Sequence, residues 1–198
     1  FRQLHVAPLI NACLVRHPGI RIELVLVDRV VDLLEEGLDL AVRIGEPPDT
    51  DVVAVPVGQM RRVTVAHPEL CTPEERPRHP RELALRPCIA FTGSGTADWV
   101  FQEASRPIRL SISGRLQTNQ ALAAVDACTK GLGFGQFLHY QPATALSAGT
   151  LRTVLEPFEP PPLPVNLIYS DTRLMSTRRR LPVSYTHLRA HETLLDLV

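Results

Sequence analysis

The spacing of apolar residues near the start of the chain predicts a helix. Its apolar positions lie three and four residues apart, as on one helical face: Val6, Leu9, Ile10, Cys13 and Leu14. The sequence His17-Pro18-Gly19 should end this helix. Pro8 indicates either a bend in the helix or the start of its first regular turn.

A strand, a helix and another strand are predicted next. Ile20–Val27 is nearly all apolar and rich in β-branched residues, which is typical of a strand buried on both faces. Asp28 can cap a short helix that Gly37 ends, and Leu38–Ile44 should form the next buried strand. This alternation favours parallel strands joined by right-handed crossovers.

Turn residues and prolines divide the following segment. Strands are predicted at Val52–Val57 and Arg62–Ala66, after a loop rich in proline and aspartate. Prolines then recur from Pro68 to Pro87, a change in composition that we interpret as the exit from a first lobe near Ala66.

A second α/β unit is predicted beyond this stretch. Its expected elements are a short helix at Glu82–Leu85, a strand at Pro87–Phe91, an alternating strand at Ile108–Leu116, a helix capped by Thr118 or Asn119, a glycine-rich strand at Leu132–Phe137, and a short helix or turn with a strand within Leu146–Leu155. The proline-rich connector Glu156–Pro164 and a strand at Val165–Ser170 should then return the chain to the first lobe.

The predicted fold class is therefore α/β with two lobes, each a mostly parallel sheet flanked by helices. Lobe I comprises residues 1–66 plus 164–182, and lobe II comprises residues 67–163. A chain of 198 residues, of which 44% are apolar, can bury a core of this kind.

Charge and apolar run length exclude some partners. The chain has 21 basic and 21 acidic residues, so it offers no general attraction to DNA phosphates or anionic lipid. No apolar run approaches the roughly 18 residues of a membrane span. We expect this chain by itself to bind neither DNA nor a membrane, although a secreted protein with a cleaved signal stays an alternative.

The sequence contains few candidate catalytic groups. Thr92–Thr96 has a GxG but not the rest of a phosphate loop, and GLGFG at Gly131–Gly135 is best explained as a helix end followed by a closely packed strand. We expect no enzyme, no cofactor and no metal site, because GxSxG, HExxH and Cys/His clusters are absent from the sequence. The four cysteines should be buried free thiols in a reducing cytosol: Cys13, Cys71, Cys88 and Cys128.

Helix N-termini are the remaining groups in the sequence that could bind a ligand. Free N–H groups at the first helix and at the helix after Thr118-Asn119-Gln120 should attract carboxylates. In an open α/β fold such ends lie at the carboxyl edge of the sheet. We therefore predict a cleft between the lobes for a small anion.

Long stretches of the chain resemble the effector-binding (substrate-binding) domain of LysR-type transcriptional regulators. The most specific is DLAVRIG at Asp39–Gly45, within Leu4–Glu46. PRELALRPCIAF, GRLQTNQALAAVDACTKGLGFG and GTLRTVLEPFEPPPLPVNLIYS agree with the family in order and spacing. The resemblance extends from Phe1 to about Arg180 and implies a fold similar to type 2 periplasmic binding proteins, truncated before Phe1.

The resemblance implies a cytoplasmic bacterial sensor. An effector in the cleft would control promoter binding by a helix-turn-helix domain absent from this chain, within a full-length homodimer or tetramer. A solute-binding protein for a transporter is the alternative. By position, the ligand-binding residues implied are Phe1, Arg2, Ile44, Gly45, Glu46, Thr92, Gly93, Thr118, Asn119, Gly135, Gln136 and Phe137.

The C-terminus departs from the family pattern. VSYTHLRAHET at Val183–Thr193 resembles a translated sequencing adapter, so we interpret residues 183–198 as a non-native tail. His187 and His191 share the spacing of a helical metal site, but in such a tail they would have no evolved role.

Overall fold

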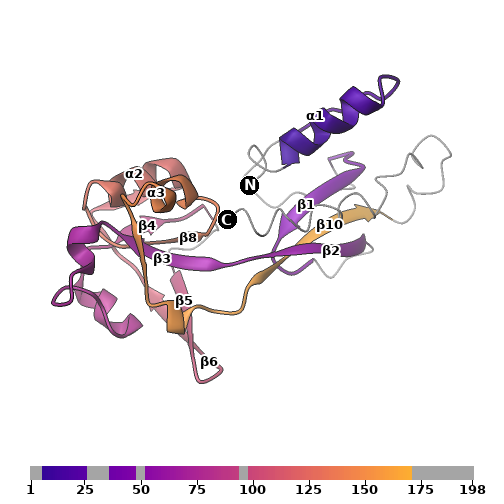
Figure 1. Ribbon diagram of the computed structural model, residues 1–198. Coiled ribbons are helices and arrows are strands. Elements are labelled where there is room, and N and C mark those ends of the chain that lie inside the picture. Colours follow the sequence, from indigo (N-terminus) through magenta and orange to yellow (C-terminus); the bar gives the residue numbers. More distant parts are fainter. Residues whose placement is uncertain (1–5, 26–35, 48–51, 94–97, 171–198) are drawn as a thin grey trace. The chain divides into compact units, whose positions relative to one another are not determined.

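The computed structural model describes residues 6–25, 36–47, 52–93 and 98–170. By its internal contacts the chain divides into two compact units, residues 1–30 and residues 31–198. Figure 1 labels helix α1 (Ala7–Arg16), which belongs to the first unit, and the strands and other helices, which belong to the second. In the first unit, α1 confirms the predicted helix, and Pro8 lies in its first turn. His17 N donates to Cys13 O at 2.9 Å, so the helix ends at the predicted stop.

The strand predicted at Ile20–Val27 is wrong over residues 20–25, which have no regular secondary structure. Ile22, Leu24 and Val25 are exposed there. A strand needs ladder hydrogen bonds from a neighbour, and none of the described sheets includes this segment. Apolar character alone therefore did not determine the structure. Residues 26–35, with the helix predicted after Asp28, lie outside the described residues.

One sheet of the second unit has the order β1-β10-β2. Its strands are β1 (Leu40–Ile44), β10 (Leu163–Ser170) and β2 (Val52–Met60). They confirm three predicted strands, but both pairings are antiparallel. The β10–β2 register shifts between Val165 and Asn166.

A second sheet has the order β8-β3-β9, from β8 (Gly135–Leu138), β3 (Arg62–Ala66) and β9 (Arg152–Val154). Only Arg61 separates β2 from β3, so the chain passes from the first sheet to the second at Arg61. The composition shift at His67 directly follows the end of β3 at Ala66. The lobe boundaries themselves stay a prediction.

The remaining strands form two pairs. β4 (Ile89–Phe91) pairs in parallel with β7 (Leu116–Thr118), while β5 (Asp98–Glu103) and β6 (Arg106–Ser111) form an antiparallel hairpin. The strand predicted at Ile108–Leu116 is thus two strands with a break between them, and β5 is additional to the prediction. Five of the six pairings between described strands are antiparallel: β10 runs opposite to β1 and β2, β3 runs opposite to β8 and β9, and β5 and β6 form a hairpin.

Three α-helices and three short 3₁₀ helices complete the described secondary structure. The second unit contains α2 (Ala121–Thr129) and α3 (Ala143–Ser147), with 3₁₀ turns at Pro68–Cys71, Pro80–Leu85 and Glu156–Phe158. The predicted cap of α2 is corrected: Gln120 is the N-cap, and its side chain makes no capping bond. No described helix is long and apolar enough to cross a membrane.

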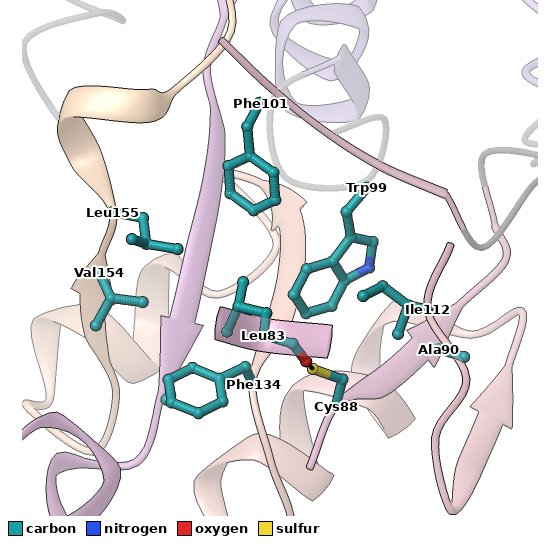
Figure 2. Packing of buried hydrophobic residues seen from close by; sticks show 10 residues of the cluster. Leu83, Cys88, Ala90, Trp99, Phe101, Ile112, Phe134, Val154 and Leu155 are labelled. Carbon is teal, nitrogen blue, oxygen red and sulfur yellow. Dashed lines mark hydrogen bonds between the residues drawn. The ribbon is translucent and has the colours of Figure 1, made fainter. Parts of the chain in front are cut away.

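Two clusters of apolar side chains form the core of the second unit. One packs β5 against the Pro80–Leu85 turn, β4 and β9 (Figure 2): Leu83, Cys88, Ala90, Trp99, Phe101, Ile112, Phe134, Val154 and Leu155, with Ala66. The other packs α2 against β3, β4 and β8: Val63, Val65, Ile89, Ala124, Val125, Ala127, Cys128, Phe137 and Leu151. The indole N–H of Trp99 is buried without a hydrogen-bond partner in the described structure.

The glycine run after α2 has the structural role expected from the sequence. Gly131, at φ +73°, ends the helix, and Gly133, at φ +155°, lies against the backbone of Pro87. A Cβ on Gly133 would lie 2.4 Å from Pro87 O. The close approach permits the parallel bridge between Cys88 and Phe134.

The cysteines are free, but only two are fully buried. Burial raises the pKa of both Cys88 and Cys128 to about 12, so these thiols stay protonated at neutral pH. Cys13 and Cys71 are only partly buried, which corrects the expectation for these two.

Candidate functional site

Four of the predicted ligand residues meet at the carboxyl end of the parallel pair β4–β7: Thr92, Gly93, Thr118 and Asn119. Phe91 and Thr118 are register partners, and Thr92 N donates to Thr118 O at 2.9 Å. Thr92 Oγ1 donates to the same oxygen at 3.3 Å. A Cβ on Gly93 would lie 3.1 Å from Asn119 O. The two loops therefore approach closely, and a glycine allows them to do so.

The N-terminus of α2 begins directly after this edge. Thr118 Oγ1 accepts from Gln120 N at 3.1 Å, which orders the turn into the helix. Ala124 N makes the first helical bond, to Gln120 O at 3.1 Å, and the Gln120 side chain caps nothing. The N–H groups of the first turn are thus available to an anion. Among the described residues of these two loops, the polar side chains are hydroxyls and amides, so an anion there would be bound through dipoles.

Three more predicted residues lie deeper, on β8. The Gln136 amide is engaged by the backbone of β5: its Nε2 donates to Val100 O at 3.0 Å, and its Oε1 accepts from Val100 N at 3.2 Å. Phe137 is 2% exposed and packs against Phe91 with ring centroids 5.7 Å apart. Gly135 is buried, and a Cβ there would lie 2.7 Å from Cys128 Sγ. The structure places these residues in the core, and their contact with a ligand stays a prediction.

Of the predicted loop Ile44–Glu46, Ile44 ends β1 in the β1-β10-β2 sheet, and Gly45 and Glu46 follow it. Gly45, at φ +110°, donates from its N to Pro164 O at 2.8 Å and accepts at its O from Asn166 Nδ2 at 3.0 Å. Glu46 is exposed. Phe1 and Arg2 lie outside the described residues.

Asn166 was not among the residues predicted from the sequence. It is 5% exposed, lies at the β10 bulge and fixes the Gly45 carbonyl. The only sequence signal is one amide inside the apolar strand VNLIY. Because buried amides are normally hydrogen-bonded, this signal indicates a partner without identifying it.

The described part of the chain can also be compared with the side-chain groupings that bind metal ions. No group of three or more His, Cys, Asp or Glu residues there could hold a metal ion. The β4–β7 edge offers backbone N–H groups and hydroxyls, which can bind a ligand but include no nucleophile paired with a base.

Comparison with known proteins identifies relatives of the whole domain. The family model for the LysR substrate binding domain matches residues 1–185. The helix-turn-helix-type transcriptional regulator YhjC of Escherichia coli K12 is 33% identical over 177 residues, covering 88% of this chain and 59% of the relative. DmlR of the same organism, another regulator of this type, is 25% identical over 182 residues and is covered over 59% of its length. The chain thus spans about six-tenths of these relatives.

Solved structures share the fold. The regulatory domain of CrgA, a LysR-type transcriptional regulator from Neisseria meningitidis, has a TM-score of 0.72 at 25% identity, with 89% of this chain and 87% of that chain covered. The full-length Vibrio cholerae virulence activator AphB has a TM-score of 0.75 at 24% identity, with 85% and 58% covered. The fold is therefore the type 2 periplasmic-binding-protein-like fold of LysR regulatory domains, as the sequence predicted. This chain belongs to the LysR substrate-binding domain family.

Proposed function

We propose that the chain senses a small anionic effector, held where the N-terminus of α2 meets the β4–β7 edge. The observation that carries the proposal is the uncapped first turn of α2 beside the Thr92 and Thr118 hydroxyls. A carboxylate can accept hydrogen bonds from these N–H groups and is favoured by the helix dipole. The loop Ile44–Glu46 would contact the effector from the other lobe, with lobe I at residues 1–66 and 164–182 and lobe II at 67–163.

In the full-length regulator, the bound effector would alter promoter binding by a helix-turn-helix domain outside this chain. The regulators among its relatives support this role, and they give no support to a transporter solute-binding protein. We further propose a cytoplasmic protein that binds its effector without converting it.

A thermal-shift screen tests the site. Small carboxylates are compared with the corresponding neutral amides, because only the carboxylates should stabilise the domain. A ligand at 100 times its Kd should add about 2.7 kcal/mol to the free energy of unfolding. Thr118→Val should reduce the carboxylate shift measured against its own ligand-free state, whereas Thr144→Val, at an exposed position on α3, should leave it unchanged. Equal shifts with acids and amides would contradict an anion site.

We also propose that copies of the domain associate as a homodimer, and as a dimer or tetramer in the full-length regulator. Val15 on α1 and Leu122 on α2 are 84% and 81% exposed, so each would add apolar area to a contact between copies. Light scattering should detect a dimer that Val15→Lys on α1 weakens. Only monomer at high concentration would count against this proposal, and sequence-specific retardation of DNA by this chain alone would contradict the role of a separate DNA-binding domain.

A further inference from the structure

Two predicted ligand segments are linked by a continuous series of contacts through the second unit. At one end, Gly45 is bonded to Pro164 and Asn166 of β10. At the other end, His139, directly after β8, donates from its N to Arg61 O at 3.0 Å. Arg61 is the residue at which the chain changes sheet.

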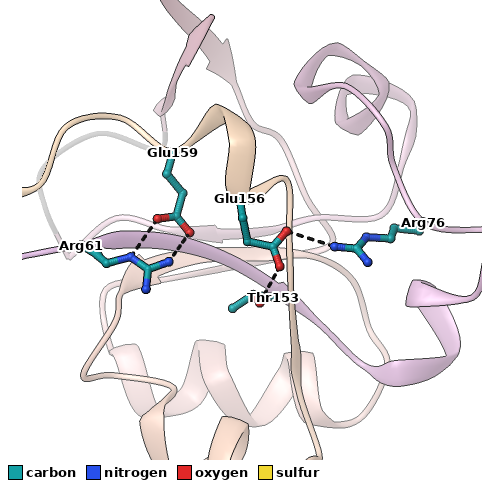
Figure 3. Close-up of polar contacts among 5 residues, drawn as sticks. All are labelled: Arg61, Arg76, Thr153, Glu156 and Glu159. Carbon is teal, nitrogen blue, oxygen red and sulfur yellow. Dashed lines mark hydrogen bonds and ion pairs between the residues drawn. The ribbon is translucent and has the colours of Figure 1, made fainter. Parts of the chain in front are cut away.

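The side chains of Arg61 and Glu159 join these two ends. Arg61 Nε and Nη2 donate to the two carboxylate oxygens of Glu159 at 3.0 and 2.9 Å (Figure 3). A bidentate pair fixes orientation as well as distance. The Glu159 side chain is only 15% exposed and that of Arg61 53%, so the pair is partly shielded from solvent.

The segment between Glu159 and β10 is stiff. Residues 160–162 are three consecutive prolines, whose rings fix φ and favour an extended, semi-rigid spacer. The ladder of β10 with β2 ends at Leu163 and Met60, beside Arg61. The Arg61–Glu159 pair therefore extends the contact between β10 and β2 past the end of their backbone pairing.

The connector is also held at its other end. Glu156 accepts from Arg76 Nη2 at 3.0 Å and from Thr153 Oγ1 at 2.8 Å (Figure 3). A displacement of the Gly45 loop would consequently be transmitted along a stiff segment instead of being absorbed by a flexible one.

We propose that Arg61 and Glu159 are positioning residues that couple the Ile44–Glu46 loop to the end of β8. This inference rests on the proposed function only for its biological role, in which an effector bound to one lobe would affect the other lobe. The coupling itself is a property of the ligand-free chain.

Amide hydrogen exchange in the ligand-free chain tests the coupling without any effector. Glu159→Gln keeps the shape of the side chain and removes its charge. The Gly45 amide, far from residue 159 in sequence, should then exchange about threefold to fivefold faster, the size expected when a partly exposed ion pair is lost. Pro161→Gly, which leaves the pair in place and loosens the spacer, should raise the same rate.

The matched control is Asp126→Asn, which removes the exposed Lys130–Asp126 pair on α2 and should leave Gly45 unchanged. Exchange of the Val65 amide in the buried β3 strand reports global stability. An unchanged Gly45 rate in both connector variants would overturn the proposal, and so would an equal acceleration at Val65, because the effect would then be general destabilisation. Either failure leaves the thermal-shift test of the effector site intact.

Discussion

Single glycines hold some backbone segments of this domain closer together than a side chain would permit. At Gly133, a Cβ would meet Pro87 O at 2.4 Å and Pro87 C at 2.7 Å, both backbone atoms that cannot turn away. Its φ of +155° also disfavours other residues. Gly133→Ala should therefore lower the free energy of unfolding by about 2–4 kcal/mol.

Denaturant titration followed by the fluorescence of the single tryptophan, Trp99, measures this loss. Gly58→Ala is the matched control, since nothing lies within 4 Å of the added Cβ. It should change stability by no more than about 0.5 kcal/mol. Equal effects of the two substitutions would show that the contact with Pro87 does not cause the loss of stability.

His139 should make stability depend on pH. Burial, and then the charge of Arg61, lowers the pKa of its imidazole below the ordinary value of 6.5. The unfolded chain consequently takes up the proton at a higher pH than the folded chain does, so this contribution to stability is lost as the pH falls from about 7.5 to 5.5. In thermal melts across this range, His139→Asn should show a shallower fall than the unsubstituted chain. If the melting temperatures of the two chains fell equally with pH, His139 would be excluded as the source of the pH dependence.

At the scale of elements, the β5–β6 hairpin has a turn whose residues do not suit its backbone. Glu103 pairs with Arg106, which leaves Ala104 and Ser105 as a two-residue turn with φ of +44° and +67°. Such turns favour Asn-Gly. The double substitution Ala104→Asn/Ser105→Gly should raise the free energy of unfolding by about 0.5–1 kcal/mol, while the β-branched Ala104→Val should lower it. Calorimetry that reversed this order would refute the turn assignment.

The same turn explains why the sequence did not predict this element. Ala104-Ser105 lacks the usual hairpin signal, and β5 shows its alternation only at Trp99 and Phe101. Helix α1 and strands β2 and β3 were predictable because their periodicity is local. The segment 20–25 was not, since strand formation depends on a partner that periodicity does not reveal.

The candidate site was predictable to a similar extent. The family resemblance implied Thr92, Gly93, Thr118 and Asn119 as ligand residues, and the structure brings these four residues together at one sheet edge. The hydrogen bonds of Gln136 and Asn166 could not be predicted, because their partners lie 36 and 121 residues away in the chain. Long-range pairing of amides has no local signal in a single sequence.

For the molecule as a whole, the sequence predicts that the C-terminal end of the chain contributes little to stability. Residues 183–198 lie outside the described residues, and their resemblance to a translated adapter implies that nothing selected their leucines for packing. Truncation after Pro182 should change the free energy of unfolding by about 1 kcal/mol or less, whereas loss of a native core helix would cost several. A large drop in the melting temperature on truncation would refute the adapter interpretation.

The bonds between Gln136 and Val100 have a consequence for the order of folding. β5 and β6 are adjacent in sequence, so their hairpin closes a short loop and can form early. The hydrogen bonds that attach β5 to β8 through Gln136 close a longer loop. These bonds should therefore form after the transition state. In stopped-flow kinetics, the turn substitution at Ala104 and Ser105 should then alter mainly the refolding rate, and Gln136→Ala mainly the unfolding rate. A side-chain amide that takes the place of a neighbouring strand would thus stabilise the native state after the transition state, without changing the folding pathway.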